Sequence, residues 1–151
     1  MTAISNKDVV RRLYKEVWND RKLHVADEIF SKSHALNDPT FTGSAVGPAA
    51  YKTQVQRFVA AFPDLKFSVE EYICEKDKVV AAWTISGTHK GEVFGIAPTN
   101  RKISVPGITI HQLSNGKILD SQAMWDALGV MVQLGHSQSA KMETRAAVSG
   151  R

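Results

Sequence analysis

Residues 103–125 have the sequence ISVPGITIHQLSNGKILDSQAMW, and this stretch decides the fold. Apolar residues alternate with other residues in its first half, which is the two-residue period of a β-strand. Ser114–Lys117, SNGK, separates the two halves, and an Asn-Gly pair in such a place is a strong hairpin signal. We therefore predict strands over 103–113 and 118–125 that pair as an antiparallel hairpin.

The same period appears upstream of this hairpin. It begins at residue 65 and predicts strands over 65–69 and 79–89, with a turn at Glu75–Lys78. Gly91–Arg101 contains two glycines and a proline, which indicates a long loop. About four strands therefore follow one another, joined mainly by hairpins.

Segments with helical spacing lie before and after the predicted strands. Apolar residues recur at helical intervals over 6–18, 23–30, 48–62 and 127–134. Residues 31–47 are rich in Ser, Asn, Gly and Pro, so we predict a loop there that could contain a short strand.

Helices followed by hairpin-connected strands predict an α+β fold. We expect a strongly curved antiparallel sheet packed against the N-terminal helices, in a cone-shaped α+β barrel with an internal cavity. The single domain should cover residues 1–135, followed by a polar, flexible tail over 136–151.

The composition excludes several classes of protein. The chain has 151 residues, a formal net charge of +4 and one cysteine, so it fits one domain without an internal disulfide. The basic residues are scattered, which does not predict a nucleic-acid surface. No apolar run is long enough to span a membrane, and the first residues lack the apolar core of a secretory signal, so we expect a cytoplasmic protein.

Six stretches together resemble one protein family. They are VVRRLYKEVWND (9–20), NDP (37–39), AAFPDLKFSVEEYI (60–73), AAWTISGTHKGEVFGIAPTNRKI (81–103), NGKI (115–118) and WDALGVMVQLG (125–135). In this order and spacing the chain resembles the SnoaL-like polyketide cyclases and ester cyclases, which have the nuclear transport factor 2-like cone fold. The resemblance covers about residues 6–135.

The resemblance implies an enzyme without cofactor or metal, in which a carboxylate moves a proton beside a carbonyl or ester group. The best studied members close a carbon ring by an intramolecular aldol reaction. Registration on NGKI and QLG places Asp126 at the family's acid/base position. We expect Met124, Trp125 and Leu128 to enclose this carboxylate and raise its pKa. The alternative is a plain helix cap, since Asp126 precedes the helix at 127–134.

Other candidates come from the neighbouring strands. Alternation places Thr109 and His111 on one face of their strand and Ile108 and Ile110 on the other. The resemblance implies that the first pair faces the cavity, where His111 could relay a proton or donate to an oxyanion. The family's cyclases carry their histidine nearer to the position of Thr109, which puts their ring-closing reaction in doubt here. A structural histidine is the alternative.

Three further residues are candidates for substrate binding. Asn37 could donate to a substrate carbonyl, or simply form an Asn-Asp-Pro turn in which Asp38 caps. Tyr14 and Trp83 are the aromatics that we expect to reach the cavity, among several that should pack in the core. His34 and His24 stand in polar stretches and should be exposed.

The remaining reactive residues have structural interpretations. His89 should anchor a loop, and Cys74 should pack rather than react. The histidine spacing matches no metal motif, so we predict no metal site.

Ile108 and Ile110 face away from the expected cavity, and an apolar sheet face predicts an interface. We therefore expect a homodimer joined through the sheets, as is common among the resembling proteins.

The sequence thus leads to three functional hypotheses. The first is a cofactor-independent cyclase or isomerase for a small hydrophobic carbonyl or ester compound, with Asp126 as general acid and base. The second is an epoxide hydrolase-like or hydroxylase-like enzyme on the same scaffold. The third is a non-catalytic module that binds a small ligand.

Overall fold

The computed structural model describes residues 5–40 and 45–135, so the predicted tail at 136–151 lies outside the described residues. The elements in chain order are α1 (Asn6–Arg12), the π-helical segment η1 (Leu13–Asn19), α2 (Val25–Ile29), β1 (Phe30–Asn37), β2 (Ala45–Val46), α3 (Gly47–Ala61), β3 (Lys66–Glu75), β4 (Lys78–Thr88), β5 (Lys102–Ser114), β6 (Lys117–Trp125) and α4 (Ala127–Gln133). The predicted α+β class is confirmed.

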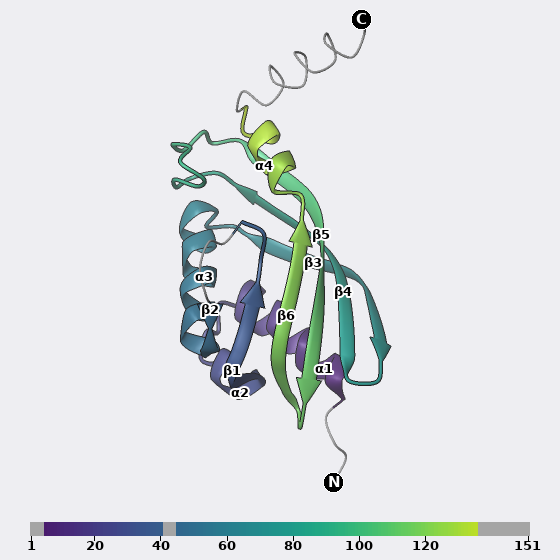
Figure 1. The fold of residues 1–151 in the computed structure, drawn as a ribbon. Coiled ribbons are helices and arrows are strands. Elements are labelled where there is room, and N and C mark those ends of the chain that lie inside the picture. Colours follow the sequence, from purple (N-terminus) through teal and green to yellow (C-terminus); the bar gives the residue numbers. More distant parts are fainter. Residues whose placement is uncertain (1–4, 41–44, 136–151) are drawn as a thin grey trace, which may run out of the picture.

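The six strands form one curved sheet in the order β2-β1-β6-β5-β4-β3 (Figure 1). Neighbouring strands are antiparallel except β1 and β6, which are parallel. The prediction of a wholly antiparallel sheet is therefore wrong at this pair. The sheet ends at β2 and β3 without closing, so it is an open cone rather than a barrel.

The hairpin that decides the fold forms as predicted. β5 and β6 pair from Gly107↔Trp125 to Ser114↔Lys117. Asn115 and Gly116 between them have φ angles of 51° and 74°. Positive φ at both central residues is the mirror-image turn that matches the twist of paired strands.

The structure differs from the prediction at residues 31–47, where most of the expected loop forms β1 and β2. Phe30 of β1 pairs with Ile118 of β6, which is far away in sequence. Ser and Asn are poor strand formers, so this strand depends on its partner and on burial of Phe30 and His34 rather than on local propensity.

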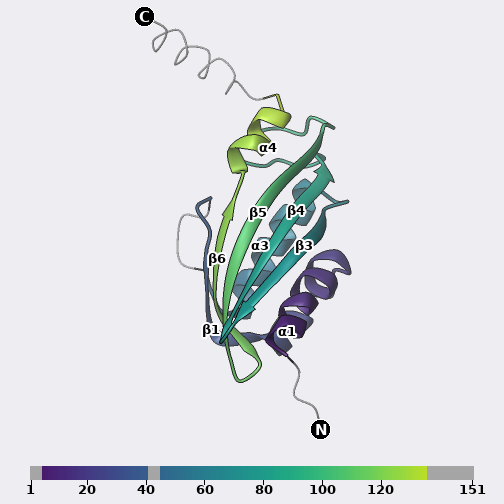
Figure 2. The ribbon, with the colours of Figure 1, turned by 90° about the vertical axis from the view of Figure 1, so that its right-hand side faces the viewer.

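The helices form one layer on the concave side of the sheet. α1 and α3 lie on the same side in Figure 2, and α4 lies at one end of the sheet. α3 begins at Gly47, and Pro48 occupies its first turn, where its missing N–H leaves no hydrogen bond unmade. The core fills the space between this layer and the inner face of the strands.

The π-helical segment η1 places two aromatic side chains inside. Tyr14 and Trp18 are four residues apart in η1, and both are buried. Asn19 ends the segment, and its side chain exchanges two 2.9 Å hydrogen bonds with the backbone of Phe67 on β3. A π-helix is rare and is frequently found at functional sites.

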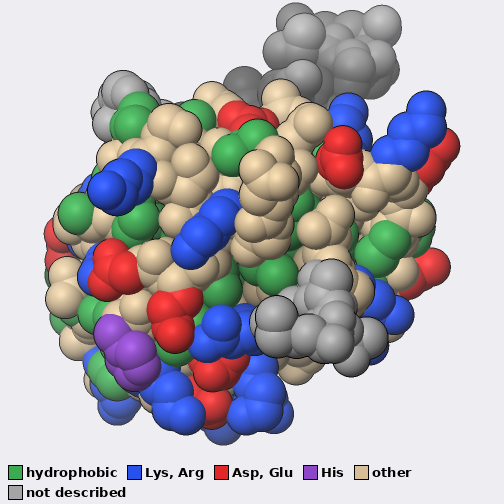
Figure 3. Space-filling view, turned by 90° about the horizontal axis from the view of Figure 1, so that it is seen from below, with side chains coloured by type: hydrophobic (Ala, Val, Ile, Leu, Met, Phe, Trp, Pro, Cys, Tyr) green, Lys and Arg blue, Asp and Glu red, His purple; other side chains and the backbone are tan. Residues whose placement is uncertain are grey.

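The surface of the described residues is of mixed charge. Basic and acidic side chains are interspersed over the face seen in Figure 3. Among the described residues, no helix has both the length and the apolar composition needed to cross a membrane.

The outer face of the sheet is apolar at its centre. Ile108, Ile110 and Met124 are 49%, 39% and 68% exposed there, while their neighbours on β5 and β6 alternate into the core. We propose that a second copy of the chain covers these side chains in a homodimer.

Replacing Ile110 and Met124 together by lysine should therefore convert the dimer into a monomer of about 16.6 kDa, measured by light scattering at micromolar concentration. Two buried, unpaired charges at the centre of the interface would oppose association. Val132→Lys, at another exposed apolar residue on α4, is the control and should leave the dimer intact. A monomeric wild-type protein would contradict the proposal.

Candidate functional site

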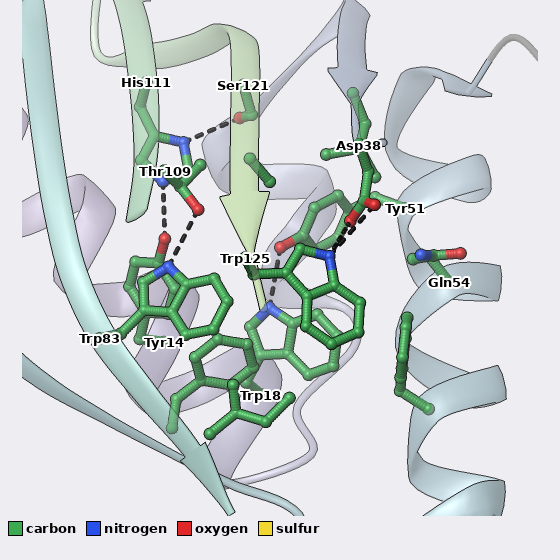
Figure 4. Close-up of a pocket in the computed structure, with 15 residues that line it drawn as sticks. Tyr14, Trp18, Asp38, Tyr51, Gln54, Trp83, Thr109, His111, Ser121 and Trp125 are labelled. Atoms are coloured by element: carbon green, nitrogen blue, oxygen red, sulfur yellow. Dashed lines mark hydrogen bonds between the residues drawn. The ribbon is translucent and has the colours of Figure 1, made fainter. Parts of the chain in front are cut away.

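A cavity lies between the inner face of the sheet and the helices, enclosed mainly by aromatic side chains (Figure 4). Trp18 and Tyr14 come from η1, Phe67 from β3 and Trp83 from β4. Their rings contact one another, with centroid distances of 4.7 Å for Trp18–Phe67 and 4.9 Å for Phe67–Trp83. The aromatic wall lowers the local dielectric, which strengthens the electrostatic effect of each polar group in the cavity.

A chain of hydrogen bonds connects four buried side chains on one side of this cavity. The Tyr14 hydroxyl lies 2.9 Å from His111 Nε2, His111 Nδ1 lies 2.8 Å from Ser121 Oγ, and Ser121 Oγ lies 2.9 Å from His34 Nε2. The members come from η1, β5, β6 and β1. We call these four residues the polar chain.

Two orders of donors satisfy the polar chain. In the inward order, Tyr14 donates to His111, His111 to Ser121, and Ser121 to His34. In the outward order each bond is reversed, so His111 donates to Tyr14 and the Tyr14 proton is free to donate into the cavity. His34 Nδ1, at the far end, is buried and has no hydrogen-bond partner among the described residues in either order.

Burial keeps every member of the polar chain neutral near pH 7. Burial and then repulsion from His34 lower the pKa of His111 to about 3. Burial lowers the pKa of His34 to about 4 and raises the pKa of Tyr14 well above its usual range. Tyr14 is therefore a neutral hydrogen-bond donor in a site with low dielectric.

Trp83 and Thr109 form a second polar contact on the same wall. Trp83 Nε1 donates to Thr109 Oγ1 at 3.0 Å, and both side chains are buried. Gly107 makes room for the indole, because a Cβ at that position would lie 2.6 Å from Trp83 Cζ2 and 2.7 Å from Trp125 Cβ. The glycine thus sets the depth of the cavity.

Asp38 is the carboxylate on the opposite side of the cavity from the polar chain (Figure 4). Its Oδ1 accepts from the backbone and hydroxyl of Thr40 at 2.8 and 2.6 Å and from Trp125 Nε1 at 3.2 Å. Its Oδ2 accepts only from Trp125 Nε1 among the described residues, at 3.1 Å. These bonds fix the carboxylate and leave Oδ2 free to accept another proton.

A larger outer hollow adjoins the inner cavity. The inner cavity has a volume of about 50 Å³, and the outer hollow, between α3 and the loop at 92–95, has about 420 Å³. Gln54 and Phe58 of α3 line both spaces. Phe58 and Phe94 pack against Trp125, with centroid distances of 5.8 and 6.1 Å, so aromatic rings lie where the two spaces adjoin.

The structure brings together four of the six predicted site residues. Tyr14, Trp83, Thr109 and His111 all line the inner cavity. The alternation predicted for β5 is also correct, because its buried positions include Thr109 and His111.

Asp126 and Asn37 do not line the inner cavity. Asp126 is exposed, and its Oδ1 accepts from Gly129 N at 2.8 Å as the cap of α4, so the expected apolar enclosure is wrong. Asn37 is exposed and donates to Asp120 at 3.2 Å. The reason is the strand period: Trp125 and Asp38 line the cavity, so the adjacent residues point away.

Sequence reasoning missed His34, Ser121 and the position of Asp38. His34 is fully buried rather than exposed as predicted, because it lies on the inner face of β1. His34, Leu36 and Asp38 have the spacing of one strand face, and this was the available signal. This spacing indicates a shared face only if residues 31–37 are first recognised as a strand.

Other predictions have mixed outcomes. His89 anchors its loop as predicted, since its Nδ1 accepts from Thr99 N at 3.1 Å and its backbone bonds Arg101 and Asn100. His24 is exposed as predicted. Cys74 is exposed, so the prediction that it packs is wrong.

The side chains that could bind a metal ion are scattered over the described part of the protein. Within residues 5–40 and 45–135, no three His, Cys, Asp or Glu side chains are close enough together to hold a metal ion.

Comparison with known families agrees with this geometry. The family model for the SnoaL-like polyketide cyclase matches residues 8–134, which include every element that lines the cavity. The chain belongs to the SnoaL-like polyketide cyclase family. No curated protein matches this SnoaL-like chain in sequence.

Solved structures share the SnoaL-like fold over most of the chain. A proposed polyketide cyclase from Acidithiobacillus ferrooxidans is 28% identical, with a TM-score of 0.77 over 89% of this chain and 97% of that one. A proposed SnoaL-like polyketide cyclase from Jannaschia sp. CCS1 is 23% identical, with a TM-score of 0.79 over 89% and 97%. AclR from Streptomyces galilaeus, a proposed hydroxylase, is 23% identical, with a TM-score of 0.74 over 86% and 95%. The last two likenesses show the fold alone.

The two buried histidines predict a pH-dependent stability. Their folded pKa values of about 3 and about 4 lie below the ordinary value of 6.5, so the unfolded chain binds more protons between these limits. Their contribution is fully present above pH 6.5 and is lost as pH falls toward 4. The loss should reach about 1.4 kcal/mol per pH unit for each histidine.

Urea unfolding of wild type and His111→Gln between pH 7 and 4.5 measures this effect. The variant should lose about half of the pH slope that the two histidines supply, because one of them remains. His24→Gln, at an exposed histidine, should keep the wild-type slope. Parallel curves for wild type and His111→Gln would contradict the assignment of His111 as a buried neutral group.

Proposed function

We propose that this SnoaL-like protein is a cofactor-independent enzyme that moves a proton beside the carbonyl of a small hydrophobic ketone or ester, with Asp38 as the general base. The observation that carries the proposal is the division of the cavity. One carboxylate lies on one side of an aromatic space, and a neutral, buried hydroxyl lies on the other.

Asp38 has the properties of a general base. Thr40 and Trp125 hold its carboxylate, and Oδ2 has capacity for a further hydrogen. A fixed base within an apolar space contributes about 10²- to 10⁴-fold to the rate of a proton transfer. This role replaces the one that the sequence suggests for Asp126, which is an exposed helix cap.

Tyr14 supplies the complementary stabilisation. In the outward order of the polar chain, its hydroxyl proton points to the cavity while its oxygen accepts from His111. A neutral donor of high pKa stabilises an enolate oxygen without becoming ionised itself. His111, Ser121 and His34 act through Tyr14 and are positioning residues.

The proposed reaction begins when Asp38 Oδ2 removes a proton from the carbon beside the carbonyl. The electron pair of the broken C–H bond forms the enolate C=C bond, and the carbonyl oxygen gains the negative charge beside Tyr14. In one course the enolate carbon attacks a second carbonyl in the same molecule, the first C=O bond re-forms, and the new alkoxide oxygen takes the proton from Asp38. In the other course the enolate is conjugated with a second C=C bond, and Asp38 returns the proton to the far carbon of this dienolate while the C=O bond re-forms. The first course is an aldol cyclisation and the second an isomerisation.

Family membership supports a polyketide-like ketone or ester as the substrate class. The hydrolase alternative needs carboxylates that can activate water. Asp38 is the one carboxylate lining the inner cavity in the described part of the chain, so the arrangement favours proton transfer at carbon.

Deuterium exchange tests the proposal directly. A panel of β-keto esters, enones and ketosteroids would be incubated in deuterium oxide with wild type, Asp38→Asn and Asp126→Asn, and analysed by mass spectrometry. Wild type should introduce deuterium beside the carbonyl of at least one compound. Asp38→Asn should lose about 10²-fold or more of this rate. Asp126→Asn should stay within a few-fold, because asparagine also caps helices.

The opposite ranking of the two variants would show that Asp126 is the base and would overturn the assignment of Asp38. Binding of compounds without exchange in wild type would instead favour the non-catalytic binding module. Incorporation of labelled oxygen from water into the product would favour the hydrolase.

A further inference from the structure

We propose that Tyr51 is a second hydrogen-bond donor of the inner cavity and binds a second oxygen of the substrate. The substrate is then a compound with two carbonyl groups on either side of one acidic carbon, such as a β-diketone or a β-keto ester. The inference rests on the proposed function for the binding of a carbonyl compound in the cavity. The role of Tyr51 itself follows from its hydrogen bond and its position.

The Tyr51 hydroxyl has a proton that no described group accepts. Trp18 Nε1 lies 2.8 Å from the Tyr51 oxygen, and both side chains are buried. An indole N–H can only donate, so the Tyr51 oxygen is the acceptor of this bond. Within residues 5–40 and 45–135, no acceptor lies in hydrogen-bond distance to take the Tyr51 proton in return. The bond to Trp18 thus accounts for the oxygen of Tyr51 and leaves its O–H free to donate.

Tyr51 differs in this respect from Tyr14. The Tyr14 proton is free only in the outward order of the polar chain, because His111 can accept it in the inward order. The direction of the bond from Trp18 is fixed, so the Tyr51 proton is free in both orders. A buried donor without an acceptor costs about 1–3 kcal/mol, and a ligand oxygen in the cavity would remove this cost.

The position of Tyr51 directs its hydroxyl to the cavity. The residue belongs to α3 and lines the inner cavity. In Figure 4 its ring reaches from the helix side toward the middle of the pocket, where its hydroxyl meets the indole of Trp18. The ring packs against Phe30 and Trp18, with centroid distances of 4.5 and 6.0 Å. These contacts hold the hydroxyl as a fixed donor in the wall.

Burial keeps this donor protonated. It raises the pKa of Tyr51 above its usual range, an effect that the Trp18 hydrogen bond partly offsets and the charge of Asp38 increases. After burial, Tyr51 is also the next cause of the raised pKa of Tyr14, so the two hydroxyls interact within one space of low dielectric. The cavity therefore contains two neutral hydroxyl donors.

Two neutral donors and one carboxylate suit a compound with two carbonyl groups. A C–H between two carbonyl groups is much more acidic than one beside a single carbonyl, which suits a weak base such as a carboxylate. When Asp38 takes this proton, the electron pair of the broken C–H bond spreads over both carbonyl oxygens. Tyr14 then donates to one oxygen and Tyr51 to the other, so both charged atoms have a neutral donor.

The size of the cavity agrees with this occupant. The inner cavity of about 50 Å³ has room for roughly three to four water molecules. Bonded atoms lie closer together than neighbouring water molecules do. The cavity therefore has space for the bonded atoms of an O=C–C–C=O unit.

Matched esters isolate the second hydrogen bond. The probes are methyl acetoacetate and methyl 3-methylbut-3-enoate, in which a CH₂ group replaces the ketone oxygen. Both carry the ester group, so they differ by one acceptor at nearly constant shape. Dissociation constants would be measured by ligand-observed NMR titration for wild type, Tyr51→Phe and Tyr72→Phe. Tyr72, on β3, does not line the cavity and is the matched control.

The quantity compared is the ratio of keto ester to alkene ester affinity. Wild type should favour the keto ester, since each of its two carbonyl oxygens meets a donor. The alkene ester has one carbonyl oxygen, for which Tyr14 suffices, so Tyr51→Phe should weaken the keto ester selectively and lower the ratio about three- to tenfold. Tyr72→Phe should leave the ratio within about twofold of wild type.

The ratio also separates binding from a structural effect of the substitution. Tyr51→Phe removes the acceptor of the Trp18 N–H, and a general disturbance of the cavity weakens two ligands of equal shape alike. Should Tyr51→Phe not fold by circular dichroism, the double variant Trp18→Phe, Tyr51→Phe removes this N–H as well and takes its place.

An unchanged ratio in Tyr51→Phe, an equal fall in Tyr72→Phe, or failure of both esters to bind wild type would overturn the proposal. The outcome is distinguishable from that of the proposed reaction. A Tyr51-dependent ratio without deuterium exchange would leave the second donor standing and reject the reaction. Asp38-dependent exchange with an unchanged ratio would reject only the role of Tyr51.

Discussion

The polar chain of His34, Ser121, His111 and Tyr14 is the constraint on which the rest of the structure depends. Four polar side chains inside an aromatic core are acceptable only when their hydrogen bonds are made, and here three bonds join η1, β5, β6 and β1. A slip of β5 by one residue would move His111 to the outer face, leave Tyr14 without its partner in the polar chain, and leave Ser121 with His34 alone. The polar chain thus fixes the register of three strands, β1, β5 and β6, and the position of η1.

The same constraint determines how the cavity is divided. Because the polar chain is neutral and buried, it can face an apolar ligand without a large desolvation cost. Among the described residues, the one carboxylate that lines the inner cavity belongs to Asp38, across the space from the polar chain, where Thr40 and Trp125 supply donors. Had that carboxylate stood next to His111, it would favour the charged imidazolium and raise the pKa of the ring. Because Asp38 and His111 are separated, one small site holds both a neutral hydrogen-bond donor, Tyr14, and a proton acceptor, Asp38.

Local patterns predicted most of the fold, and their failures have one cause. The β5–β6 hairpin and α3 follow from alternation, an Asn-Gly turn and helical spacing, all of which act between near neighbours. β1 depends on a parallel partner far away in sequence, so its Ser- and Asn-rich stretch gave no local signal. That single omission hid His34 and left Asn37 and Asp38 without assigned faces. Tyr14, Trp83, Thr109 and His111 stand on elements that were predicted, and all four reach the cavity.

The far end of the polar chain explains why a separate base is needed. Within the part of the protein that the structure describes, His34 Nδ1 has no hydrogen-bond partner, so no side chain there accepts a proton from that end of the polar chain. The inward and outward orders of the polar chain hold the same number of protons and differ in which nitrogen of each histidine carries the hydrogen. A ligand carbonyl favours the outward order, because only there does Tyr14 offer its proton to the cavity. The polar chain therefore stabilises developing charge on the carbonyl oxygen of the ligand. A separate group, Asp38, is needed to remove the proton from carbon.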